Sequence, residues 1–197
     1  MTVKQTDRVQ IQSFGNRGVE LFNAIENQLR NLVVNTAEVN YEGRNAFDFK
    51  TACVNYSHDF AVACTGNMQQ ISQTITEATT YIATALGGAP IDLEPPTVVI
   101  DPPAVSADTS VETAEDGPLI ELRGLVELSF GEIESSFDEN LANFQALGAD
   151  GWIGPEYDAA LSEVNLLTTK ATEEAALART TIVGAINSQL QALGMGG

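Results

Sequence analysis

The prolines of this 197-residue chain are confined almost entirely to one stretch near its middle. Six of the seven fall within residues 87–118, which also hold seven acidic residues and no basic ones. Proline removes a backbone N–H and interrupts helices, and an acidic, proline-rich composition is typical of an extended, solvated linker. The sequence therefore predicts three parts: residues 1–86, a linker over 87–118, and residues 119–197.

Both flanking parts carry apolar residues at three- and four-residue steps, which is the pattern of amphipathic helices. In residues 1–86 the first stripe covers about thirty residues, or roughly 45 Å of helix. A second stripe follows a polar break at residues 40–45 and ends at a double glycine. These stripes are Ile11, Phe14, Gly18, Leu21, Ile25, Leu29 and Leu32, then Cys53, Tyr56, Phe60, Cys64, Met68, Ile71, Ile75, Ala78, Ile82 and Leu86.

Residues 119–197 repeat this plan, with one stripe that ends at Gly148 and a second that follows a turn. Stripes of this length at heptad-like spacing indicate paired helices. We therefore predict four helices and an all-α fold. The two stripes are Leu122, Val126, Phe130, Ile133, Phe137, Leu141, Phe144 and Leu147, then Tyr157, Leu161, Val164, Thr168, Ala171, Ala175, Ala178, Ile182, Ala185 and Leu193.

The length of the linker bears on how the two helical hairpins pack. If their turns lie at opposite ends, the linker must travel the length of the bundle, about 45 Å. Its 32 residues reach roughly 100 Å when extended. We therefore predict two helix-turn-helix hairpins that pack as an antiparallel four-helix bundle. The same linker also allows exchange between two chains, so a self-contained monomer and a homodimer both stay open.

A large excess of acidic residues narrows the classes of function. The 27 acidic and 9 basic side chains give a net charge of −18, which repels nucleic-acid phosphates and anionic lipid headgroups. We therefore expect no nucleic-acid partner, and no membrane insertion because no run of about 18 apolar residues occurs. The charge is uneven, with −2 in residues 1–86, −7 in the linker and −9 in residues 119–197.

The reactive side chains predict that the chain is not an enzyme and has no catalytic, cofactor-binding or metal site. A histidine-based triad would rest on His58 alone, and one histidine with two cysteines cannot build the usual zinc site. No phosphate-binding loop, His-Glu-x-x-His or Gly-x-Ser-x-Gly motif is present. Cys53 and Cys64 would lie roughly 16 Å apart along one helix, too far to bridge. We interpret them as small buried residues, the alternative being reactive or intermolecular thiols.

The two predicted turns share an aromatic residue that is followed two positions later by glycine. Tyr41 and Gly43 form this pair in the first turn, and Trp152 and Gly154 form it 111 residues later. An aromatic ring can fold back over the tip of a hairpin, while glycine permits a tight backbone. Pro155 suits the first turn of the helix that follows. These four residues are the candidate site residues, and packed helix corners are the plain structural explanation of them.

The string from Asp150 to Glu156 resembles the actinobacterial form of the WXG motif, including its Gly-Pro-acidic continuation. A Trp-x-Gly turn midway through long amphipathic helices is similar to the WXG (ESAT-6-like) family of type VII (ESX) secretion substrates. The resemblance covers Leu119–Leu193 and, with Tyr41 in place of the tryptophan, Thr6–Leu86. The chain thus resembles two WXG hairpins fused in tandem. The family pairs such hairpins into four-helix bundles, so one chain here would supply both partners.

The resemblance implies a non-enzymatic protein that acts by helical protein–protein interaction, as a secreted substrate or as the partner of an effector. Its expected partners are type VII secretion components or a co-secreted protein, which would bind at the turn that contains Trp152. It is expected to leave the cell by a route without a signal peptide, since Met1–Gln10 is polar. Before export it would be cytoplasmic.

One feature of the resemblance is missing, and it leaves a second interpretation open. Type VII substrates commonly carry a Tyr-x-x-x-Asp/Glu signal past the second helix, whereas none of the four tyrosines here has an acid four residues later. The alternative is a structural or assembly helical bundle, cytoplasmic or phage-derived, with no role in secretion. Such a protein needs only the stripes and the turns.

Overall fold

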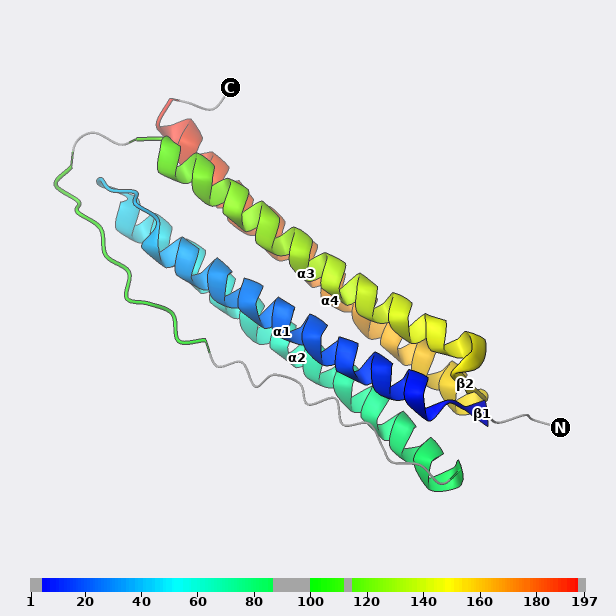
Figure 1. Cartoon of the computed structure of the whole chain (residues 1–197). Helices are drawn as coiled ribbons and strands as arrows, with labels where there is room; N and C mark the ends of the chain where they lie inside the picture. The colour runs from blue at the N-terminus through cyan, green and yellow to red at the C-terminus, as the bar shows by residue number, and fades with distance from the viewer. Residues whose placement is uncertain (1–4, 87–99, 112–114, 195–197) are drawn as a thin grey trace.

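The computed structural model describes residues 5–86, 100–111 and 115–194. Within these residues the chain forms four long helices and two very short strands, which lie together as one elongated bundle (Figure 1). The prediction of an all-α helical bundle is confirmed. In chain order the elements are β1 (Gln5–Thr6), α1 (Arg8–Glu38), α2 (Ala46–Leu86), α3 (Gly117–Asp150), β2 (Trp152–Ile153) and α4 (Pro155–Ala192).

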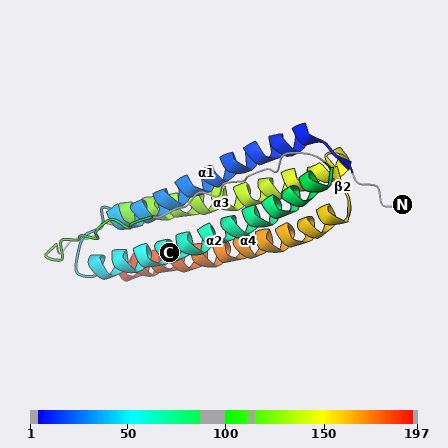
Figure 2. The same cartoon turned by 90° about the horizontal axis from the view of Figure 1, so that it is seen from below.

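Each helix packs along two others, so that the four form a ring in the order α1, α2, α4, α3. The view from below shows the same elongated arrangement (Figure 2). Tyr41, in the turn between α1 and α2, contacts Gln189 near the end of α4. Thr6, just before α1, pairs with Trp152 in the turn between α3 and α4. The two turns therefore lie at opposite ends of the bundle.

The apolar stripes form the core of the bundle. Phe22, Ile25 and Leu29 of α1 are fully buried. The ring of Phe60 in α2 lies 5.0 Å from that of Phe130 in α3, measured between centroids. Each such side chain contributes about 1.5–3 kcal/mol when fully buried, so packing outweighs the weak helix propensity of the many Thr, Val and Ile residues.

The ends of the helices have local causes in the sequence. The Asp7 carboxylate caps α1 by accepting hydrogen bonds from the backbone N–H groups of Val9 and Gln10, at 2.8 and 3.1 Å. α3 begins at Gly117, two residues before the predicted boundary. Proline is tolerated in a first helical turn, where its missing N–H has no helical partner, so Pro118 belongs to the helix rather than to the linker.

Part of the predicted linker packs against the first turn. Ile100 is buried, and the buried Lys50 ammonium donates a hydrogen bond to the Ser106 carbonyl at 2.9 Å. The backbone N–H of Gly43 donates to the Asp108 carbonyl at 3.0 Å. Residues 100–111 therefore lie on the α1–α2 hairpin at these points. Residues 87–99 and 112–114 of the predicted linker lie outside the described residues.

Candidate functional site

The second turn is closed by the N-terminal segment of the chain. β1 pairs with β2 as an antiparallel ladder in which Thr6 lies opposite Trp152. The backbone N–H of Asp7 donates to the Gly151 carbonyl at 2.6 Å. This pairing ties the beginning of α1 to the turn between α3 and α4. The polar sequence of this N-terminal segment does not predict the pairing.

Trp152 lies beneath this turn and its side chain is 0% exposed. Its ring packs edge-on against Phe144, with centroids 6.2 Å apart, and lies 5.6 Å from the ring of Tyr157. The indole N–H has no hydrogen-bond partner among the described residues. Trp152 is therefore a packing residue. A protein that binds at this turn would contact the exposed Ile153 and Pro155 instead.

The glycines of both turns adopt backbone conformations that side chains disfavour. Gly154 has φ 151° and ψ 166°, a region occupied almost only by glycine. Its carbonyl accepts the backbone N–H groups of Tyr157 and Asp158, at 3.0 and 3.2 Å. Gly43 has φ 120°, and its carbonyl accepts the N–H of Ala46 at 3.1 Å. Gly154 is thus the residue directly before α4, whereas Gly43 closes the turn that leads into α2.

A contact between Tyr157 and Gly148 also shapes the second turn, and the sequence did not single it out. A Cβ atom on Gly148 would lie 2.6 Å from the Tyr157 hydroxyl, so only glycine leaves room for the ring. The hydroxyl lies 3.1 and 3.0 Å from the Phe144 and Gln145 carbonyls. Burial raises the pKa of Tyr157. A shallow hollow of about 310 Å³ adjoins this contact and is lined by Gly148, Trp152, Ile153, Gly154, Pro155, Tyr157 and Asp158.

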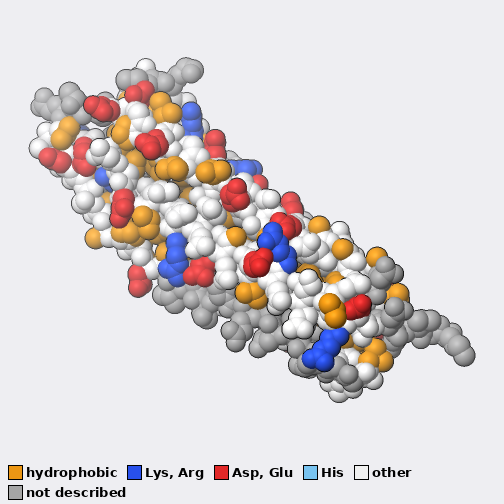
Figure 3. Space-filling view, in the orientation of Figure 1, with side chains coloured by type: hydrophobic (Ala, Val, Ile, Leu, Met, Phe, Trp, Pro, Cys, Tyr) orange, Lys and Arg blue, Asp and Glu red, His pale blue; other side chains and the backbone are white. Residues whose placement is uncertain are grey.

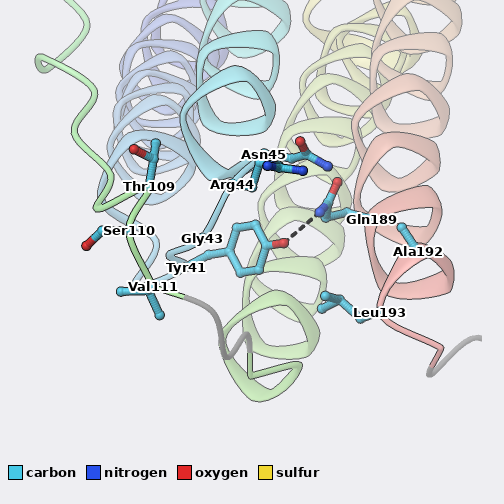
Figure 4. A pocket seen from close by; sticks show the side chains of 10 residues that line it. All are labelled: Tyr41, Gly43, Arg44, Asn45, Thr109, Ser110, Val111, Gln189, Ala192 and Leu193. Carbon is cyan, nitrogen blue, oxygen red and sulfur yellow. Dashed lines mark hydrogen bonds between the residues drawn. The ribbon is translucent and has the colours of Figure 1, made fainter.

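Tyr41 fixes the first turn against the far end of α4. Its ring is buried and meets Phe49 edge-on, with centroids 5.6 Å apart. Its hydroxyl accepts a hydrogen bond of 2.6 Å from Gln189 (Figure 4). Lys50 lies 3.6 Å from the Glu42 carboxylate, which also accepts the backbone N–H of Asp108. The first turn is thus joined both to residues 100–111 and to α4.

These segments border a second hollow, with a volume of about 550 Å³ (Figure 4). The residues around it come from the turn, from residues 109–111 and from the end of α4. Three hydroxyl side chains, which can act as nucleophiles when a base activates them, but no histidine, cysteine or carboxylate occur among the described lining residues. They are Tyr41, Gly43, Arg44, Asn45, Thr109, Ser110, Val111, Gln189, Ala192 and Leu193.

The cysteines and the histidine lie away from both turns. Cys53 and Cys64 are buried free thiols, and burial raises the pKa of both, that of Cys53 to about 12. The prediction that they are unbridged, small buried residues is confirmed. His58 is half-buried, with its Nδ1 4.0 Å from the Asp59 carboxylate. Among the described residues, no three His, Cys, Asp or Glu side chains are placed to hold a metal ion.

The structure brings the four predicted site residues together as two pairs rather than as one site. Tyr41 and Gly43 lie at one end of the bundle, and Trp152 and Gly154 lie at the other. Of the helices described, none has the length and apolar character needed to cross a membrane. Comparison of the chain with protein-family models, curated proteins and solved structures finds no match.

Proposed function

We propose that the chain is a non-enzymatic, tandem WXG-like protein of a type VII (ESX) secretion system. It acts by helical protein–protein interaction, as a secreted substrate or as the partner of an effector. One observation carries the proposal. Each turn holds a buried aromatic residue two positions before a glycine of positive φ, and each such turn joins two long helices.

In this proposal the two halves of the chain take the place of two separate proteins. Residues 1–86 and 119–197 are the two hairpins, the linker over 87–118 joins them, and they pack as an antiparallel bundle. The contacts of α1 with α3 and of α2 with α4 support this assignment, because they bury the stripes of one half against those of the other. A third protein would then bind an outer face of the helices.

The alternative is a structural or assembly bundle with no role in secretion. The absence of a Tyr-x-x-x-Asp/Glu sequence at all four tyrosines favours it. The two functions differ in where the protein is found. A type VII substrate leaves the cell only when the ATPase of the system is present, whereas a cytoplasmic scaffold does not leave it.

The test compares the parent strain with a strain that lacks the type VII ATPase. We expect the chain in the culture filtrate of the parent, its loss from the filtrate of the deletion strain, and its return when the ATPase gene is restored. A cytoplasmic marker protein measured in the same filtrates controls for lysis. Unchanged export without the ATPase, or no export from the parent, contradicts the proposal.

A further inference from the structure

Large hydrophobic side chains are exposed on the outer side of the α2–α4 pair. Tyr56 and Tyr81 of α2 are 44% and 56% exposed, and Leu166 and Leu177 of α4 are 63% and 69% exposed. Single exposed apolar residues are common on protein surfaces, whereas a group of them on one face marks an interaction site. These four side chains indicate an interaction site only if they share a face.

The two tyrosines lie on the side of α2 that borders α4. Asn67 of α2 donates a hydrogen bond of 2.7 Å to Glu174 of α4, which marks that side. Tyr56 precedes Asn67 by eleven residues and Tyr81 follows it by fourteen. At about 100° per residue, both point within about 40° of the direction of Asn67.

The two leucines lie on the outer side of α4, toward α2. Leu166 follows the buried Val164 by two residues, and Leu177 follows the buried Ala175 by two, so each leucine points about 160° away from the core. Going around the axis of α4 from Val164 and Ala175 toward the side of α2, one passes Glu174 before reaching the two leucines. The four exposed side chains thus lie on one outer side of the α2–α4 pair, which we call the α2/α4 face and define by Tyr56, Tyr81, Leu166 and Leu177.

The α2/α4 face is long enough to hold a docked helix. From Tyr56 to Tyr81 it spans 25 residues of helix, or roughly 38 Å. Apart from the exposed acids Asp59 and Glu77, the residues between them on this side of α2 are small or uncharged, and a Cβ on Gly66 would meet nothing within 4 Å. These residues are Ala63, Gly66, Gln70 and Gln73.

Exposed acids border the α2/α4 face. Glu163 and Glu173 of α4 make no ion pair with the described residues, and Glu77 of α2 is also exposed. Lys170 of α4, an exposed cation on this side, lies 3.9 Å from Glu174. A partner for this surface therefore needs an apolar stripe with basic residues beside it. A second copy of this chain is disfavoured, because it would bring another −18 of net charge.

We propose that the α2/α4 face docks a basic amphipathic helix of about 25 residues from another protein. Its apolar stripe would cover Leu166 and Leu177, its ends would meet the two tyrosines, and its lysines or arginines would face Glu163 and Glu173. This proposal rests on the proposed function only in that the chain acts by helical protein–protein interaction. It does not depend on secretion.

The probe is a synthetic 25-residue peptide of leucine and lysine, with its leucines at three- and four-residue steps. Binding to the full chain is measured by calorimetry. We expect binding that weakens about tenfold or more in the double variant L166Q/L177Q, since two apolar contacts are removed. A peptide of the same composition with its leucines scattered should not bind.

The matched control is L128Q. Leu128 is 60% exposed on α3, next to Ser129, whose hydroxyl donates to Gln28 of α1. It therefore lies on another side of the bundle, and L128Q should bind the peptide as the unmodified chain does. Circular dichroism checks that both variants keep the fold.

Three results overturn the docking proposal: no binding of the patterned peptide, equal binding of the scattered peptide, or equal binding by L166Q/L177Q. If the peptide fails while export still requires the ATPase, only the docking face is wrong. If export is independent of the ATPase while the peptide binds as expected, only the secretion role is wrong.

Discussion

The backbone of Gly154 is the most constrained single position of the candidate site. Its φ of 151° with ψ 166° excludes other residues at a cost of about 1–3 kcal/mol. We expect Gly154→Ala to lower the free energy of unfolding by that amount, measured by denaturant titration. Gly184→Ala is the control, since a Cβ there meets nothing within 4 Å and alanine favours a helix interior by about 0.5–1 kcal/mol. Equal effects of the two changes would contradict the role given to Gly154.

The two cysteines test the burial of the α2 stripe. A thiol with a pKa of about 12, such as Cys53, is ionised to only about one part in ten thousand at pH 8, and the thiolate is the reactive form. We expect neither cysteine to react rapidly with a disulfide reagent at pH 8 in the folded chain. Both should react in guanidinium chloride, and Cys53→Ala should reduce the count to one. A thiol that reacts at once in the folded chain would show that α2 is not packed as described.

At the scale of elements, α1 depends on the cap that Asp7 provides directly after β1. The carboxylate accepts two backbone N–H groups that have no helical partner. We expect Asp7→Ala to cost about 1 kcal/mol of unfolding free energy, and Asp7→Asn to cost much less because asparagine caps equally well. Thermal unfolding followed by circular dichroism compares the two. A loss of the same size in Asp7→Asn would point to charge rather than to the hydrogen bonds.

The helices could be predicted from the sequence, whereas the contacts that close the turns could not. Stripes such as Phe130, Ile133 and Phe137 repeat over many turns, so periodicity located the helices to within a few residues. β1 has two residues, too few for any periodic pattern, and its partner lies far along the chain. The fit of Tyr157 against Gly148 depends in the same way on three-dimensional packing, so the sequence could offer only the aromatic-x-glycine spacing.

At the scale of the whole molecule, one chain completes the ring of four helices. Each helix packs along two neighbours from the same chain, so no helix needs a second copy to cover its core side. We therefore expect a monomer of 21.0 kDa by light scattering at low concentration, with a high helix content. A stable species of twice that mass would instead indicate exchange of hairpins between chains, or pairing through an outer face.

The net charge of −18 opposes folding of the molecule as a whole. The acidic side chains lie closer together in the folded bundle than in the unfolded chain, so they repel one another more strongly there. Ion pairs offset little of it, since Arg17 with Glu139 and Arg30 with Glu26 lie largely at the surface. The Debye length falls from about 30 Å at 0.01 M salt to about 10 Å at 0.1 M. We expect Tm to rise over this range, by about 2–4 °C for each 1 kcal/mol of relieved repulsion.

The triple variant E121Q/E127Q/E132Q removes three exposed charges, so it should begin with a higher Tm and gain less from salt. A Tm that falls as salt is added would mean that attraction, rather than repulsion, dominates the charges of the folded state.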